Sequence, residues 1–287
     1  MPDYLDDLAR RGYLDSIEKP SPARVYDYLL GGKHNYAVDR EFAKQIIAAN
    51  PDTPLGAKSN RAFIGRAVRC AVEMGITQFV DVGSGLPGPG QPHDVADAVA
   101  RAEGREPDSR VVYVDYEPIA HAHAEILLAR EADPRRHHAV IADYNEPETL
   151  WNAVLAPGVI REDEPTCFLV TSMLHFQPPE KNPHESMEFY RSELAPGSLL
   201  VLTHASRSAH REANGVFDRY KQTTDSVVAR TPEEIEAFFG DWELLDPGLV
   251  WMPEWRPDGT EQPWWGDDLV RTAAMGGIAV KPRGDGG

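Results

Sequence analysis

The sequence predicts an α/β protein built on a doubly wound parallel sheet. From residue 78 onward, short apolar runs alternate with helical patterns, which is typical of strands joined by right-handed helical crossovers. A glycine-rich stretch, residues 83–90, follows the first run directly, and acidic residues stand at the ends of the first three runs. Strand, glycine turn and helix in this order indicate a nucleotide-type cofactor site at the carboxyl edge of the sheet.

The expected elements divide the chain into an N-terminal helical extension and a larger domain. Strands are expected at residues 78–82, 110–115, 138–142, 166–171, 199–203, 242–245 and 277–280. Helices are expected between them at residues 94–103, 119–130, 148–155, 185–194 and 232–239, and before the sheet at residues 23–30, 39–49 and 58–74. We therefore expect a helical extension or lid over residues 1–57 and the main domain over residues 58–287.

Composition limits the classes of partner. Of 287 residues, 41% are hydrophobic, enough for a large core, and the net charge is −17. Such a charge disfavours duplex nucleic acid or an anionic membrane surface as the main partner. The only two cysteines, Cys70 and Cys167, form no C-x-x-C motif, and no run of about 18 apolar residues occurs. We expect a cytoplasmic protein that binds a small molecule, without a membrane or nucleic-acid partner, and we leave a homodimer open.

The glycine stretch alone does not identify its ligand. Gly83, Gly85 and Gly88 satisfy G-x-G-x-x-G, which is the dinucleotide fingerprint. Asp81 lies just before this turn, where its carboxylate would repel a pyrophosphate. Three prolines, at positions 87, 89 and 92, delay the helix whose N-terminus a pyrophosphate needs. The next strand-end acid, Asp115, follows Gly83 by 32 residues, whereas a dinucleotide site expects about 20.

A cationic ligand without phosphate suits this acidic turn better, and S-adenosylmethionine is such a ligand. Its amino group and sulfonium are positive, so Asp81 is expected to offset their charge or to hold the turn. Asp115 or Glu117 is expected to accept from the two ribose hydroxyls. Asp143 is expected to accept from the adenine amine, with Tyr144 beside the ring. Because parallel strand ends share one edge, these carboxylates are expected to lie together.

Two further segments are candidates for the site. Residues 24–36 concentrate tyrosines, glycines and polar residues after a short helix, which indicates either a helix end and loop or a wall of the site. The candidates there are Tyr28, Gly32, His34 and Tyr36. On the helix expected at residues 58–74, Lys58, Arg61, Arg66 and Arg69 are expected to form a solvated basic face, although Asn60 and Arg61 can alternatively reach a ligand at the sheet edge. Phe63, Ala67, Cys70, Ala71 and Met74 form the expected buried face of that helix.

Four motifs carry a family resemblance. They are DVGSGLPGPG, VVYVDYEP, IADYNEPE and TSMLHF, and together they resemble the class I S-adenosylmethionine-dependent methyltransferases. The segments ARVYDYLLGGKHNYAVDREFA, NRAFIGRAVR and GGIAVKP resemble an actinobacterial branch, the S-adenosyl methyltransferase family once catalogued as a domain of unknown function. The resemblance runs from about residue 20 to residue 282. It implies a Rossmann-like, mostly parallel sheet of seven strands in the order 3-2-1-4-5-7-6, with the last strand antiparallel.

The resemblance also implies the cofactor and its residues. Asp81, Gly83 and Gly85 would hold the methionine portion, Asp115 the ribose and Asp143 the adenine. With their neighbours the predicted cofactor site comprises Asp81, Gly83, Ser84, Gly85, Asp115, Tyr116, Asp143 and Tyr144. The proline-rich loop after Gly85 departs from the commonest class I pattern, which leaves open the backbone amides that contact the cofactor there.

Methyl transfer needs a pocket that positions the acceptor against the cofactor and excludes water. A hydroxyl or carbon acceptor also needs a general base within about 3 Å. His175, which follows the fourth strand, is the preferred candidate. His204, Tyr36 and His34 are further candidates, and no ligand cluster for a metal is evident. Two alternatives to a methyltransferase remain open from the residues: an NAD-type oxidoreductase, and a non-catalytic S-adenosylmethionine-binding protein.

Overall fold

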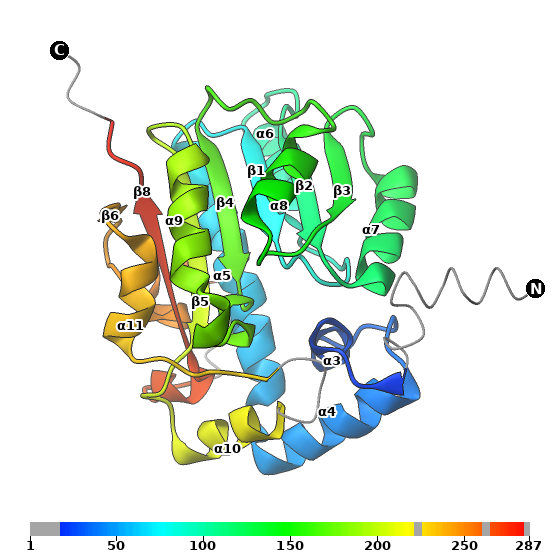
Figure 1. The fold of residues 1–287 in the computed structure, drawn as a ribbon, viewed down its shortest axis with the longest axis vertical. Helices are drawn as coiled ribbons and strands as arrows, with labels where there is room; N and C mark the ends of the chain where they lie inside the picture. The colour runs from blue at the N-terminus through cyan, green and yellow to red at the C-terminus, as the bar shows by residue number, and fades with distance from the viewer. Residues whose placement is uncertain (1–17, 221–225, 260–264, 284–287) are drawn as a thin grey trace, which may run out of the picture.

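The computed structural model describes residues 18–220, 226–259 and 265–283. Within these ranges it contains a sheet of eight strands in the order β3-β2-β1-β4-β5-β8-β6, with β7 paired to β8 (Figure 1). Strands β1 to β5 are parallel, and β8 is antiparallel to β5. The strands are β1 (Gln78–Val82), β2 (Arg110–Asp115), β3 (His137–Ile141), β4 (Thr166–Thr171), β5 (Leu199–Ala205), β6 (Glu243–Leu244), β7 (Val250–Trp251) and β8 (Ala274–Val280).

The predicted order of the sheet is confirmed, with β8 in the place given to the seventh strand. The predicted number of strands is corrected from seven to eight, because β7 pairs with the first part of β8. This strand has only two residues, which is too short for any period of two to be recognised in the sequence. Its second residue, Trp251, begins the tryptophan-rich segment 251–268, which precedes β8.

The helices that connect the strands mostly begin at a proline. Proline is favoured in the first helical turn because its missing N–H would have no partner there. The helices are α3 (Pro22–Leu29), α4 (Ala37–Ala49), α5 (Thr53–Glu73), α6 (Pro92–Ala102), α7 (Pro118–Glu131), α8 (Pro147–Leu155), α9 (Pro183–Glu193), α10 (Arg211–Arg219) and α11 (Pro232–Glu236). The sequence did not predict α10, since asparagine and glycine in its middle are poor helix formers.

Two hydrophobic cores cover the two faces of the sheet. Val80 and Val82 point to the side of α8, α9 and α11, whereas Phe79 points to the side of α5, α6 and α7. Alternate residues of a strand face opposite sides, so Asp81 shares the face of Phe79. Figure 1 shows α8 and α9 in front of the sheet and α5 and α6 behind it. The predicted doubly wound architecture is therefore confirmed.

The buried face of α5 is mostly as expected. Phe63, Ala67, Cys70 and Ala71 are buried, and both cysteines of the chain are free thiols. Two expectations for this helix are wrong. Met74 is 44% exposed, because it lies just beyond the last turn. Arg66 is buried, because its guanidinium donates to the carbonyl oxygens of Trp255 and Met252 and so anchors the tryptophan-rich segment.

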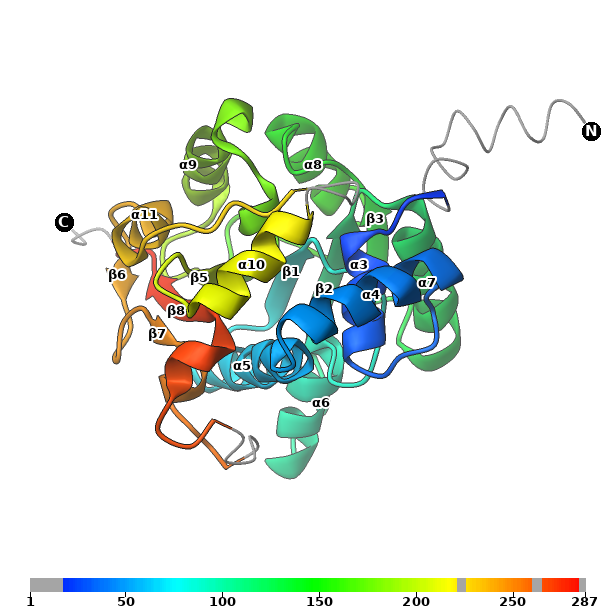
Figure 2. The ribbon, with the colours of Figure 1, turned by 90° about the horizontal axis from the view of Figure 1, so that it is seen from below.

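Three helices, α3, α4 and α10, cover the carboxyl edge of the sheet (Figure 2). We call them the cap. The cap has its own apolar cluster, distinct from the two main cores. Val25 from α3, Ile46 from α4 and Val216 from α10 are buried together in it, with Ala57 from α5. The predicted N-terminal extension thus packs with α10, a helix about 160 residues further along the chain.

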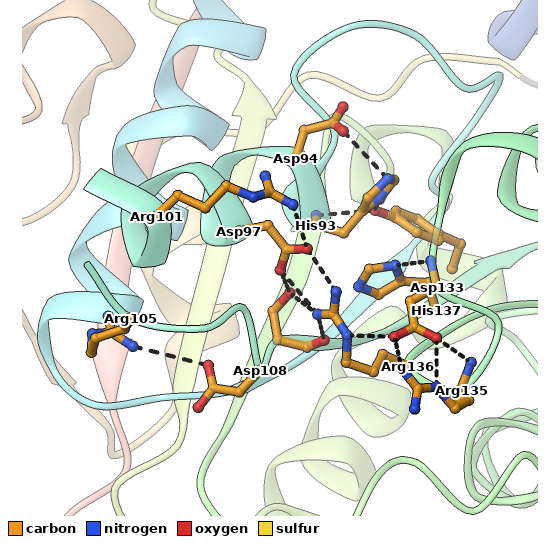
Figure 3. Close-up of polar contacts among 12 residues, drawn as sticks. His93, Asp94, Asp97, Arg101, Arg105, Asp108, Asp133, Arg135, Arg136 and His137 are labelled. Atoms are coloured by element: carbon orange, nitrogen blue, oxygen red, sulfur yellow. Dashed lines mark hydrogen bonds and ion pairs between the residues drawn. The ribbon is translucent and has the colours of Figure 1, made fainter. Parts of the chain in front are cut away.

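A polar cluster fixes α6, the helix that follows the glycine turn, on the sheet (Figure 3). Asp97 of α6 accepts from Arg136 at 2.8 Å and from Ser109 at 2.5 Å, and Arg101 lies 3.7 Å away. Nearer the turn, the ring of His93 hydrogen-bonds to the hydroxyl of Tyr113. α6 is therefore held against the sheet by contacts of its own side chains with Tyr113 of β2 and with Ser109 and Arg136, which directly precede β2 and β3.

Candidate active site

A cavity of about 260 Å³ lies at the carboxyl edge of the sheet, beneath the cap. The ends of β1 to β5, the start of β8, the N-terminal half of α5, and α3 and α10 of the cap surround it. Ten of the predicted site residues line it: Arg61, Asp81, Gly83, Ser84, Gly85, Asp115, Tyr116, Asp143, Tyr144 and His175. The residues of three consecutive strand ends therefore meet in one space.

The backbone of the glycine turn has a conformation that favours glycine over residues with a side chain. Gly83 and Gly85 have φ angles of 70° and 65°, in the left-handed region that favours glycine. A Cβ atom at Gly83 would lie 2.5 Å from Cγ of Met173, so this position is also sterically closed. The N–H groups of Gly83 and Ser84 both donate to the carbonyl oxygen of Val114, at 2.8 and 3.0 Å, which fixes the turn against β2.

Asp115 connects this turn to the end of β2. One carboxylate oxygen accepts from the N–H of Gly85 at 2.7 Å, and the other accepts from the N–H of Glu117 at 2.9 Å. Burial raises the pKa of Asp115 to about 6, although these N–H groups oppose the shift. The carboxylate oxygens of Glu117 already accept from Arg24 and from the N–H of Ala120. Asp115 and Glu117 both line the cavity, and each of their carboxylate oxygens already accepts a hydrogen bond within the protein.

Asp81 is the most unusual acid of the site. Its side chain is 5% exposed and lines the cavity, and no described residue makes a hydrogen bond or ion pair to it. Burial raises its pKa to about 7, the charge of Arg61 opposes this shift, and the charge of Asp115 adds to it. A buried acid without a partner is costly in its ionised form, so a cationic ligand in the cavity would favour ionisation.

The third acid and its neighbours have other partners. Asp143 accepts from the backbone N–H and the side-chain amide of Asn145, at 2.9 and 2.7 Å. Tyr144 borders the cavity, but its ring packs in the core against Tyr190 and its hydroxyl donates to the carbonyl of Pro183. Tyr116 is 48% exposed at the cavity, so its ring has more freedom than that of Tyr144 to contact a ligand.

The comparison with protein families decides between the remaining alternatives. A family model described as S-adenosyl methyltransferase matches residues 10–282. The chain belongs to this S-adenosyl methyltransferase family. It is thus an S-adenosylmethionine-dependent methyltransferase, and the NAD-type alternative and the non-catalytic alternative are set aside.

Solved structures agree with this assignment. A crystal structure of a candidate methyltransferase from Thermobifida fusca has 36% identity and a TM-score of 0.83, over 93% of this chain and 97% of that one. A DUF574 family protein from Streptomyces avermitilis has 31% identity and a TM-score of 0.83, over 93% of this chain and 99% of that one. Among curated proteins, none matches the chain.

The site of the methyltransferase fits its cofactor by two observations. The backbone at Gly85 borders open space, since a Cβ atom there would meet only Ala23 at 4.0 Å, and the carboxylate of Asp81, which pairs with no described group, lines the same cavity. Across the described part of the chain, no group of three or more His, Cys, Asp and Glu residues is arranged to hold a metal ion. In those same ranges, no helix has the length and apolarity needed to cross a membrane.

The four candidates from residues 24–36 lie outside the cavity lining. They are Tyr28 of α3 and, in the loop after this helix, Gly32, His34 and Tyr36, whereas Tyr26 and Leu29 of α3 do line the cavity. The polar groups of this loop bind Asp27 instead, which accepts from the N–H of His34 at 2.9 Å. A Cβ atom at Gly32 would collide with the same carboxylate. The ring of His34 packs on His123 of α7, with centroids 4.5 Å apart, and the loop thus stabilises the cap itself.

A buried arginine joins the cap to the cofactor edge. The guanidinium of Arg24 donates to Asp39 of α4 and to Glu117 after β2, both at 2.8 Å. Asp39 also accepts from the N–H groups of Ser21 and Tyr36, which closes the start of α4. The polar density of residues 24–36 is therefore explained by this network.

Sequence reasoning missed a second polar chain beneath the cavity. Asn60 of α5 donates to the hydroxyl of Tyr26 at 2.9 Å and accepts from Thr203 of β5 at 2.6 Å. The hydroxyl of Thr203 also accepts from the N–H of Ser172 at 2.8 Å. Ser172 has a φ of 51°, a conformation uncommon outside glycine that is often found at functional sites. No spacing in the sequence brings these four segments together.

The two candidate histidines have different environments. His175 lines the cavity, and burial with the nearby charge of Arg230 lowers its pKa to about 3, so it is neutral at physiological pH. His204 is fully buried and lies outside the lining, although it was expected to face the site. Its ring nitrogens contact the carbonyl of Ala205 and the guanidinium of Arg230, both at 2.8 Å, because Arg230 occupies the space beside this strand end.

Proposed function

We propose that the enzyme methylates a small, largely apolar acceptor bound between α10 and the ends of β4, β5 and β8. The predicted cofactor acids stand at the ends of β1, β2 and β3, on one side of the cavity. The cavity continues on the other side, over the next three strands of the sheet. That part is the space left for an acceptor once the cofactor occupies the glycine turn.

The composition of this second part carries the proposal. Its strand ends contribute small residues, Ala205, Ala273 and Ala274. Aromatic residues stand around them, namely Phe176 after β4 and Phe217 and Tyr220 at α10, and the rings of Phe176 and Tyr220 lie 5.7 Å apart. A flat apolar body between such walls would bury its surface without losing hydrogen bonds to water.

The residues of this chain would act mainly by binding and orienting the cofactor and the acceptor. The bound cofactor supplies a methyl group on a positively charged sulfur. We propose that Asp81, Gly83, Ser84 and Gly85 hold the methionine end, that Asp115 holds the ribose, and that Asp143 and Tyr116 contact the adenine, with Tyr144 supporting them from the core. The cap would exclude water, which strengthens the electrostatic interactions beneath it. His175 would act as a neutral group that orients the acceptor.

A transfer assay tests the acceptor class. The enzyme would be incubated with radiolabelled S-adenosylmethionine and a panel of small phenols, amines, thiols and carboxylic acids. Phe217→Ala should raise the KM for the best acceptor roughly tenfold, because an aromatic wall is lost. The cofactor affinity should stay unchanged. Ile126→Ala, at a residue 57% exposed on α7, is the control. Transfer only to protein or nucleic acid would refute the proposal.

The cellular context is a part of the same proposal. We propose a small-molecule substrate in the cytoplasm of an actinobacterium, and the net charge of −17 supports the absence of nucleic acid or an anionic membrane as a partner. We also propose that residues 1–57 form the lid of the main domain 58–287, although the first 17 residues lie outside the described part. A homodimer stays a prediction, and light scattering of the purified chain is its test.

A further inference from the structure

Two opposite charges face the cavity without pairing to each other. Asp81 lies near the end of β1 and is buried, and Arg61 of α5 is half-buried and lines the same cavity. Among the described residues, no hydrogen bond or ion pair within 4.0 Å involves either side chain. The two groups are nevertheless close enough for the guanidinium to act on the ionisation of the carboxyl.

The other cationic side chains that line the cavity are paired or exposed. Arg271 donates two hydrogen bonds to the carboxylate of Asp52, at 2.7 and 2.8 Å, and its charge is therefore compensated. Lys181 is exposed on the loop after β4. Arg61 thus combines a place in the lining of the cavity, near Asp81, with five N–H donors that no described protein group uses. Such a planar fork matches the geometry of a carboxylate.

We propose that Arg61 binds the carboxylate of the amino-acid end of S-adenosylmethionine while Asp81 binds its ammonium group. An amino-acid end is a zwitterion, and its two charges need two opposite partners that are held apart. A direct ion pair between Arg61 and Asp81 would consume both partners. Because the two groups line the same cavity without such a pair, both can bind the ligand, and the site would select a cofactor with a complete amino-acid end.

This inference rests on the cofactor of the family and not on the identity of the methyl acceptor. Titration calorimetry on the full chain with three ligands distinguishes the role of Arg61 from that of Asp81. S-adenosylmethionine carries both charges of the amino-acid end, its decarboxylated form keeps only the ammonium, and methylthioadenosine lacks both. No turnover is needed, so the result does not depend on finding an acceptor.

The wild-type protein should bind S-adenosylmethionine about 10- to 100-fold more tightly than its decarboxylated form, as is typical for a charge-assisted contact. Arg61→Met should remove this preference, leaving the two ligands within about threefold of each other. Arg61→Lys keeps the charge but not the fork and should retain part of it. The matched control is Lys58→Met, which removes an exposed charge outside the lining of the cavity, one turn earlier on α5, and should leave the preference intact.

Asp81→Asn should weaken both charged ligands alike and change the affinity for methylthioadenosine by less than about threefold. The inference is overturned if Arg61→Met keeps the wild-type preference, or if it weakens all three ligands equally. Thermal unfolding of each variant without ligand checks that it is folded, and Arg61→Lys provides a second measurement if Arg61→Met is not. Failure of the wild-type protein to bind any of the three ligands would instead contradict the cofactor itself.

Discussion

The carboxylate of Asp115 accepts a hydrogen bond from the N–H of Gly85 at 2.7 Å, across the end of the sheet. The residue proposed to bind the ribose therefore also holds the glycine turn that receives the methionine end. Its second oxygen is bound by the N–H of Glu117, the residue that Arg24 of the cap contacts. The turn, the ribose acid and the cap are thus one connected unit before any ligand binds.

Asp115→Asn should weaken S-adenosylmethionine about 10- to 100-fold, because an amide nitrogen cannot accept from both the backbone and a hydroxyl. Titration calorimetry measures the affinity. The surface substitution Asp108→Asn is the control, since this acid is exposed and far from the cavity lining. A loss below threefold would argue that the ribose is held elsewhere.

Cofactor affinity should increase as the pH rises from 5 to 8. Burial raises the pKa of Asp115 to about 6 and that of Asp81 to about 7, and a cationic ligand prefers both groups ionised. Binding near pH 6 should therefore release protons, and affinity should fall roughly tenfold between pH 8 and pH 6. Calorimetry in two buffers with different ionisation enthalpies measures the released protons. An affinity that is flat over this range would contradict the pKa values.

Asp81→Asn should stabilise the ligand-free protein at pH 8. The usual pKa of this carboxyl is 3.8 and its folded value is about 7, so the folded state binds the proton more tightly. The proton on Asp81 therefore stabilises the folded state. This stabilisation is fully present below pH 4 and is lost as the pH rises to 7. Removing the charge should then raise the free energy of unfolding on the order of 1–3 kcal/mol at pH 8, as measured with urea. A variant less stable than wild type at pH 8 would disagree with this sign.

Gly83→Ala should cost about 2–4 kcal/mol of stability and abolish tight cofactor binding, because the φ is strained and the new Cβ collides with Met173. The matched substitution Gly88→Ala lies in the same loop, where φ is ordinary and no atom lies within 4 Å of the new Cβ. It should change stability by less than about 0.5 kcal/mol. Equal effects of the two variants would mean that the turn tolerates a side chain.

His175→Ala should lower turnover roughly tenfold without abolishing cofactor binding, because the ring borders the acceptor part of the cavity. Since burial lowers its pKa to about 3, its ionisation should not appear in the rate profile between pH 5 and 9. Initial rates with the acceptor found in the panel assay measure both effects. Unchanged turnover would remove His175 from the candidates.

The sequence predicts most strands and the cap helices α3 and α4 well, but it does not predict α10 or the way the cap is assembled. β1, β2 and β4 have the bounds that their apolar runs indicate, because burial on both faces leaves a continuous signal. The strand-end acids meet because parallel strands share an edge. The cap depends on contacts between distant segments, and α10 contains residues that disfavour a helix. Likewise, the polar residues 31–36 signal a constrained loop, but nothing local reveals that Asp27 is their partner.

The apolar cluster of the cap has a consequence for how such an enzyme could change its acceptor. Val216 of α10 packs with Ile46 of α4, so the wall proposed to contact the acceptor is not shaped by α10 alone. A bulkier or smaller side chain in that wall would leave a clash or a void on the other helix. Evolution of acceptor preference should therefore proceed by paired substitutions, one near the start of the chain and its compensating partner in the last third.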